Sequence, residues 1–250
     1  MHTFVEVVKW LTSAAHWHGS NGIPVRTLQH LELTFAALAL ATLVALPLGL
    51  LIGHTRRGEV LAVSIANVGR AIPSFAVLVI SFSIVLSLQP KLAFGFVPTL
   101  AALFLLAIPP ILTNAYVGVQ QVDRDTVEAA RGMGLSGRQV LLGLELPLAA
   151  PVIMAGIRTS ALQVVATATL SALIAGGTLG RYIVDGFATS DTVESVAGAV
   201  LIAGLAFLLE LGFAGLERLV RPRTSSTRRP PRRLVGGKGT VDPLTRPAAV

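Results

Sequence analysis

Residues 121–147 read QVDRDTVEAARGMGLSGRQVLLGLELP, a polar stretch between two long apolar ones. Asp125 followed three residues later by Glu128 is the pattern of a capping box at a helix start, and Ser136 with Gln139 repeats it. Gly134 falls between them as a C-cap candidate, because glycine readily adopts the left-handed backbone of a helix end. We predict two short helices joined by a glycine turn.

This loop is too polar to enter a bilayer and too apolar on one side to stay fully solvated, which favours a cytoplasmic protein partner. Ala129 and Ala130 beside Glu128 leave a face for close packing, and Arg131 and Arg138 can pair with acids on that partner. The alternative is a loop that folds back on its own helix ends.

The composition is that of a membrane protein. Hydrophobic residues make up 53% of the 250 residues and charged residues 13%, whereas soluble domains carry about 25% charged residues. A membrane helix needs about 20 mainly apolar residues. Five segments qualify, so we expect an all-α integral membrane protein with spans within Leu28–Gly53, Ala71–Leu88 and Phe96–Gly118, and at about Leu148–Ala175 and Val193–Leu216.

The loop charges predict the orientation, because short cytoplasmic loops carry an excess of Lys and Arg. Arginines follow the first span at Arg56 and Arg57, occur again in the 121–147 loop, and fill the tail after the fifth span. We therefore expect the N-terminus outside and the C-terminus in the cytoplasm.

The excess of positive charge lies in the C-terminal tail. Nine of the 20 Lys and Arg lie from Arg218 onward, against one acid, Asp242. A Pro/Arg-rich end is not a folded nucleic-acid surface, and its composition favours disorder and contact with anionic membrane lipid. The chain has no Cys, which excludes disulfides and thiolate sites. The first 27 residues do not have the pattern of a signal peptide.

The loop also resembles a known family. Glu128-Ala129-Ala130, Gly134 six residues after the Glu, and Leu144, Leu146 and Pro147 further on are similar to the E-A-A…G…I-x-L-P loop of the inner-membrane permeases of binding-protein-dependent ABC importers. Leu144 replaces the usual Ile. Residues 67–74, 156–160 and 176–183 resemble the osmoprotectant branch, the glycine betaine, carnitine and choline permeases.

The resemblance, which covers about residues 28–217, implies a fold of the type-I importer permease kind in a bacterial inner membrane. It implies two permease subunits, identical or paralogous, each held by a cytoplasmic ABC ATPase, and an external substrate-binding protein. We divide the chain into an external segment (1–27), a transmembrane domain (28–217) with the coupling loop (119–147), and the basic tail (218–250). In the loop Glu128 would cap and fix the helix, the alanines would permit docking, and Gly134 would make the turn.

Two charges lie well inside the predicted spans. Arg158 is about 15 Å beyond Pro147 at 1.5 Å per residue, and Glu210 is its candidate partner. Arg158 faces either the pathway or the subunit interface, or it is a structural ion pair or reaches the inner surface. Arg70 and Glu32 are expected at the interfaces.

Other features are weaker. Gly49 and Gly53 form a G-x-x-x-G, which is either a helix contact or background composition. The two Trp and two Tyr provide no aromatic cage, so substrate selection is assigned to the binding protein. Residues 236–240 depart from a phosphate loop, so we expect ATP and Mg²⁺ on the partner ATPase and no cofactor on this chain. The five His lie outside the spans or at their ends and the five Asp lie in loops, so we expect no catalysis. His16 and His18 have no third ligand nearby, so we expect no metal.

We therefore interpret the chain as the permease of an osmoprotectant importer. One alternative is an importer of amino acids or other small solutes. Another, from a different class, is a non-transporting membrane scaffold or channel.

Overall fold

The computed structural model describes residues 2–220, apart from the side chains of residues 2, 61, 65, 66, 70 and 220. Every regular element in this part of the chain is helical, which confirms the all-α prediction. In order they are α1 (His2–Thr12), α2 (Ile23–Thr55), α3 (Glu59–Ala71), α4 (Ser74–Leu88), α5 (Phe96–Gln120), α6 (Arg124–Gly132), α7 (Gly137–Val140), α8 (Leu146–Ala168), α9 (Gly180–Thr189) and α10 (Thr192–Val220). Short 3₁₀ turns lie at Ala14–His16, Pro90–Leu92 and Thr169–Ile174, and a π-helical turn at Leu141–Glu145.

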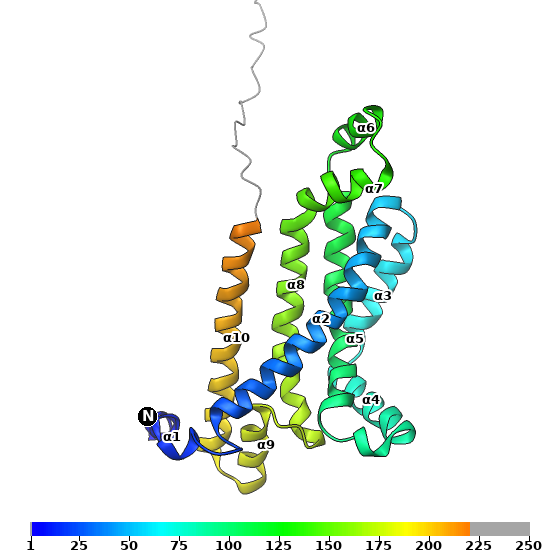
Figure 1. Cartoon of the computed structure of the whole chain (residues 1–250). Helices are drawn as coiled ribbons and strands as arrows, with labels where there is room; N and C mark the ends of the chain where they lie inside the picture. Colours follow the sequence, from blue (N-terminus) through cyan, green and yellow to red (C-terminus); the bar gives the residue numbers. More distant parts are fainter. Residues whose placement is uncertain (1, 221–250) are drawn as a thin grey trace, which may run out of the picture.

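The core lies where α2 crosses α5 and α8 (Figure 1). Its buried residues are mostly small or branched, so that the helices approach closely; they include Ala37, Ala41 and Ala45 of α2, Ala107 and Ile111 of α5, and Ala161, Val164 and Ala168 of α8. Membrane helices associate through such close packing, because lipid provides no hydrophobic driving force between them.

The G-x-x-x-G motif of α2 is a helix contact. A Cβ on Gly49 would lie 2.5 Å from the Ala115 Cβ, and one on Gly53 would lie 2.7 Å from the Val119 Cβ. No side chain fits at either position without movement of α5. The G-x-x-x-G motif therefore marks a contact between helices and is not background composition.

The second predicted span, within Ala71–Leu88, contains α4, which begins at Ser74. The sequence did not predict α3 before it, and the axes of the two helices are bent by 95°. Pro73 lies at the bend, and a proline disfavours helical backbone in the residue before it. Because α3 ends at Ala71, the backbone of Arg70 lies close to this bend. The Arg70 side chain, predicted to be interfacial, lies outside the described residues.

Four helical stretches are long and apolar enough to cross a membrane: 23–55, 96–120, 137–174 and 192–219. The bent pair α3–α4 brings the total to five if it is one span, in keeping with the prediction of about five. The first stretch begins at Ile23, five residues before the predicted boundary at Leu28.

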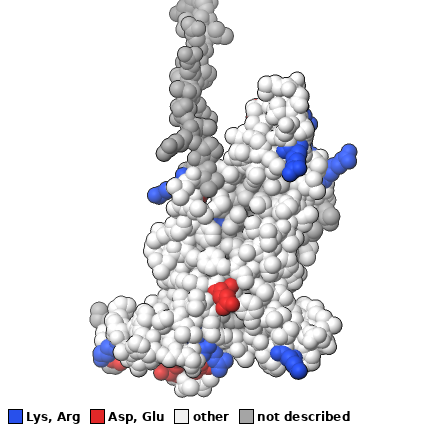
Figure 2. Space-filling model, in the orientation of Figure 1, with Lys and Arg blue, Asp and Glu red and all other residues white. Residues whose placement is uncertain are grey.

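The helix ends divide between two ends of the molecule. The C-terminal ends of α2, α5 and α10 lie at one end with α6 and α7, and α1, α4 and α9 lie towards the other (Figure 1). Charged side chains gather at both ends, and one acidic patch interrupts the nearly uncharged band between them (Figure 2). The loops predicted to be cytoplasmic thus share one end, whereas the orientation across the membrane stays a prediction.

The N-terminal segment is helical and packs on the bundle. The Trp10 indole at the end of α1 stacks on His16 and meets the edge of Tyr182 of α9, with ring centroids 3.8 and 5.3 Å apart. The basic tail predicted to be disordered and lipid-binding lies outside the described residues, from residue 221 on.

Candidate functional site

The first loop helix, α6, is capped by Asp123, not by the predicted Asp125. The Asp123 carboxylate accepts hydrogen bonds from the Thr126 N–H at 3.1 Å and the Thr126 hydroxyl at 2.7 Å. These bonds hold the pKa of Asp123 below its usual value. Asp125 lies inside the first turn, where its negative charge interacts favourably with the positive end of the helix dipole.

Glu128 does not cap α6, because it lies in the middle of the helix with its side chain exposed. Ala129 is exposed beside it, whereas Ala130 is buried at 6% exposure. The three residues thus divide between two faces of α6. Glu128 and Ala129 are available to a docked protein, and Ala130 packs against the chain itself.

The turn after α6 requires glycine, as predicted. Gly134 has a φ of +89°, and its N–H donates to the Arg131 carbonyl at 2.9 Å. The Leu135 N–H then reaches the Ala130 carbonyl at 3.2 Å. These bonds satisfy carbonyls that the helix end would leave free.

The second loop helix, α7, begins with the predicted capping box. The Ser136 N–H donates to the Gln139 side-chain oxygen at 2.8 Å, and the Ser136 side chain faces the backbone of Gln139. The chain passes from α7 through the π-helical turn into α8 without a loop. α6 and α7 therefore connect directly to a membrane-spanning helix.

The last motif residues lie in that connection. Leu144 is in the π-helical turn, and Pro147 is in the first turn of α8. Leu146 packs against the cluster of Ala115, Val119 and Ile153. The apolar end of the motif fixes the start of α8 on α5.

A part-buried contact between a histidine and a glutamate, which the sequence did not indicate, joins this site to α2. Glu145 is 4% exposed, and its carboxylate lies 2.5 Å from Nδ1 of His54. The two residues are 91 positions apart in the chain. The pair ties the C-terminal end of α2 to the turn that leads from the loop into α8.

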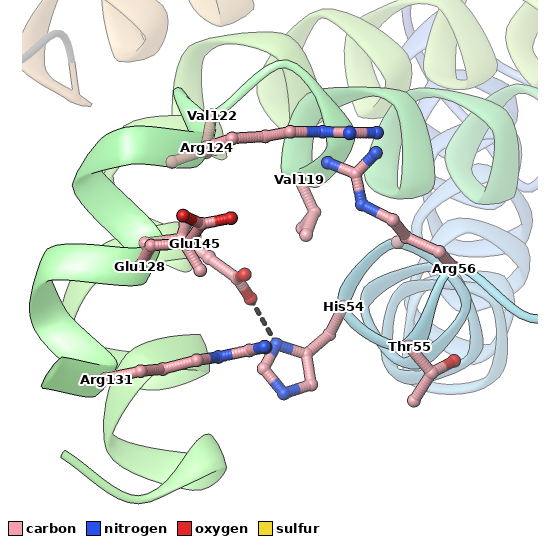
Figure 3. A pocket seen from close by; sticks show the side chains of 11 residues that line it. His54, Thr55, Arg56, Val119, Val122, Arg124, Glu128, Arg131 and Glu145 are labelled. Atoms are coloured by element: carbon pink, nitrogen blue, oxygen red, sulfur yellow. Dashed lines mark hydrogen bonds and ion pairs between the residues drawn. The ribbon is translucent and has the colours of Figure 1, made fainter. Parts of the chain in front are cut away.

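A charged pocket of about 300 Å³ lies between α6 and the ends of α2 and α5. Arg124, Glu128 and Arg131 of α6 point across it towards Arg56 and the His54–Glu145 pair (Figure 3). Movement of α6 would therefore change the surroundings of charges on α2 and on the turn before α8. Arg138 is exposed and does not line this pocket.

The intramembrane arginine has two partners, not one. Nε of Arg158 donates to Glu210 at 2.8 Å, and Nη1 donates to Glu217 at 3.1 Å. Glu217 follows Glu210 by two helical turns on the same face, a spacing that could have indicated the second partner. All three side chains are partly exposed, so the cluster lies at the margin between α8 and α10. A role in the pathway stays a prediction.

The predicted residues thus form two separate groups, the loop with its connection to α8 and the Arg158 cluster. Residues 2–220 contain no group of three or more His, Cys, Asp or Glu that could hold a metal.

Comparison with known proteins assigns residues 45–226 to the binding-protein-dependent transport system inner membrane component. The chain is 37% identical over 197 residues to the choline transport system permease protein OpuBB of Bacillus subtilis (strain 168), covering 79% of this chain and 88% of that protein. It is 36% identical to the glycine betaine/carnitine/choline transport system permease protein OpuCB of the same organism, with the same coverage. Identity to the carnitine transport permease protein OpuCB of Listeria monocytogenes is 35%, covering 81% and 90%.

Solved structures share the fold. A chain of the methionine ABC transporter MetNI in an inward-facing conformation superposes with a TM-score of 0.70 at 21% identity, covering 78% of this chain and 94% of that one. A chain of an amino acid ABC transporter with histidines gives a TM-score of 0.61 at 20% identity, covering 86% and 96%. These likenesses describe the fold alone.

Proposed function

The chain belongs to the family of binding-protein-dependent transport system inner membrane components, and from that membership we propose that it forms the pathway by which osmoprotectants such as glycine betaine, carnitine or choline enter the cell. The family is one of multi-pass membrane subunits of ABC importers. The observation that carries the substrate class is the 35–37% identity to permeases named for choline, carnitine and glycine betaine over about four fifths of the chain.

Membership implies an ATPase and a substrate-binding protein as partners. We place ATP and Mg²⁺ on a separate ABC ATPase, and we assign no catalysis to this chain. A second permease, identical or paralogous, completes the pathway, and the binding protein delivers substrate at the end opposite α6.

The coupling role proposed for the loop is supported by its geometry. α6 exposes Glu128 and Ala129 beyond the ends of the spans, and α7 continues through the turn at residues 141–145 into α8. The His54–Glu145 pair adds a second connection to α2. In this proposal α6 docks on the ATPase, and its displacement reaches α8 and α2 together.

Uptake measurements test the substrate class. Cells that express the chain with its ATPase and binding protein should accumulate labelled choline, carnitine or glycine betaine in an ATP-dependent manner. Accumulation of methionine or histidine with no uptake of the quaternary ammonium compounds would replace this proposal by the amino-acid alternative.

Co-purification tests the coupling. Glu128→Lys and Gly134→Pro should lose the ATPase while the permease stays at normal abundance in the membrane, with Gln121→Lys as an exposed control outside α6. Retention of both the ATPase and transport in the two loop variants would contradict the coupling role and favour the scaffold or channel alternative.

A further inference from the structure

A second pocket, of about 330 Å³, opens at the end of the molecule opposite α6. Three parts of the chain line it: the first turns of α2, the turn before α5, and the segment that follows α8. Its volume is at the lower end of the range for small-molecule sites.

One wall carries a carboxylate without a partner. Glu32 lines the pocket and is exposed, and within residues 2–220 no hydrogen bond or ion pair engages it. It lies nine residues into α2, about 13 Å from the helix start. A charge at such a place in a membrane helix faces water or a partner charge, not lipid. Glu32, which the sequence places at an interface, therefore marks a hydrated surface, whereas Glu210 and Glu217 of α10 are paired with Arg158.

The facing wall is aromatic. Phe94 and Phe96 line the same pocket and are 63% and 42% exposed. Gly95 between them has a φ of +82°, which lets the chain turn so that both neighbours reach the pocket.

This aromatic turn is held in place by its own contacts. The Gly95 N–H donates to the Ile174 carbonyl at 2.7 Å, and the Thr99 hydroxyl donates to the Gly95 carbonyl at 2.7 Å. The Phe94 ring meets the Phe82 ring edge-on at 5.6 Å. The turn is therefore positioned before any ligand arrives, which lowers the entropic cost of binding.

A polar group on α2 completes the lining. The amide oxygen of Gln29 is buried and has no hydrogen-bond partner within the described residues, although this side chain lines the pocket. An amide can accept a hydrogen bond from a hydroxyl or, turned over, donate one to a carboxylate. A buried polar group without a partner is costly, and a polar ligand would remove that cost.

We propose that this pocket binds the quaternary ammonium group of the transported solute, with Glu32 neutralising the cation, Phe94 and Phe96 facing its methyl groups, and Gln29 receiving its carboxylate or hydroxyl. A quaternary ammonium has no N–H to donate, so aromatic faces and a carboxylate are the groups that recognise it. The inference rests on the proposed function for the identity of the solute, and it adds a substrate site on the permease to the one expected on the binding protein.

The absence of cysteine from the chain allows a direct binding test. Ala175 is exposed in the pocket lining, so a thiol reagent should modify Ala175→Cys in the detergent-solubilised, assembled transporter. Tetramethylammonium at about ten times its dissociation constant should slow that modification about tenfold. Ser20→Cys, exposed and outside the pocket, should react at the same rate with and without the ligand.

Three further variants test the chemistry in the Ala175→Cys background. Glu32→Gln should weaken protection about tenfold and Phe94→Leu about two- to fivefold. Phe35→Leu, one turn beyond Glu32 and outside the pocket lining, should have no effect. The uncharged choline isostere 3,3-dimethylbutanol should not protect.

Equal protection by the uncharged isostere, no protection by tetramethylammonium, or a thiol that never reacts would each overturn this site, even in a transporter that takes up choline. Protection that depends on Glu32 in a transporter that takes up no quaternary ammonium compound would uphold the site and overturn the proposed function.

Discussion

Gly49→Ala tests how tightly α2 and α5 are packed. The added Cβ would lie 2.5 Å from the Ala115 Cβ and 2.9 Å from the Leu112 carbonyl oxygen. Ordinary carbon–carbon contact is about 3.5–4.0 Å, so the helices must separate by roughly 1 Å. Overpacking of this kind costs about 1–3 kcal/mol, which corresponds to a fall in Tm of roughly 2 to 12 °C for a chain of this size.

The measurement is thermal unfolding of the detergent-solubilised transporter, followed by loss of the monodisperse peak in size-exclusion chromatography. Gly212→Ala is the matched control, because it is a glycine within a spanning helix with open space where the Cβ would lie. Adding Ala115→Gly to Gly49→Ala removes the shorter of the two contacts and should restore part of the lost Tm. A Tm for Gly49→Ala no lower than that of Gly212→Ala would refute the close contact.

Four other outcomes are expected. Gly134→Ala should weaken co-purification of the ATPase, because a non-glycine residue in left-handed backbone costs about 1–2 kcal/mol, and an unchanged yield would contradict the turn's importance. Arg158→Gln should reduce membrane abundance or transport more than Glu210→Gln does, since the latter leaves Arg158 a second carboxylate; the reverse order would contradict the shared pair. Glu145→Ala should slow transport while the ATPase stays bound. Normal transport in this variant would show that the contact with His54 does not transmit movement of the loop to α2. The last outcome concerns Asp123, whose pKa is depressed in the folded protein. Protection of the α6 amides in hydrogen exchange should be complete above the ordinary Asp pKa of about 4, and it should fall as the pH drops through the lower pKa of the folded state. The variant Asp123→Asn keeps a cap but should lose this pH dependence.

Sequence patterns predicted local geometry best where a backbone conformation requires a particular residue type. Gly134 lies in left-handed backbone, and Ser136 with Gln139 forms a capping box, because these requirements are met within four residues of chain. The first cap was assigned to Asp125 because Glu128 follows it by three residues, as in a capping box. Asp123 has Thr126 at that spacing and caps α6 by a different bond, to the Thr126 N–H and hydroxyl.

Charge intervals predicted the straight spans and located α4, but they did not predict α3 before it. The residues before Arg70 are mostly apolar, so α3 extends back to Glu59, and Pro73 then interrupts the helix. Counting uncharged residues began the span after Arg70, close to the start of α4 at Ser74. The signal that could have indicated α3 is the mostly apolar run from Val60 to Val68.

Long-range pairs had no sequence signal strong enough to find them. His54 and Glu145 lie in different predicted segments, and nothing local distinguishes either from an interfacial charge. The Phe94 and Phe96 wall was missed because only Trp and Tyr were considered for a cation site. Only the folded chain brings that turn to the same pocket as Glu32.

The two acceptors of Arg158 on one helix bear on how the spans can move. Glu210 and Glu217 are seven residues apart, about 10 Å along α10, and the guanidinium between them reaches both. Small axial sliding of α8 along α10 can therefore shift the cation from one carboxylate towards the other without leaving it unpaired. Rotation of α8 about its own axis would carry Arg158 away from both carboxylates at once. The Arg158 cluster therefore permits small translations of α8 along α10 and resists rotation of α8.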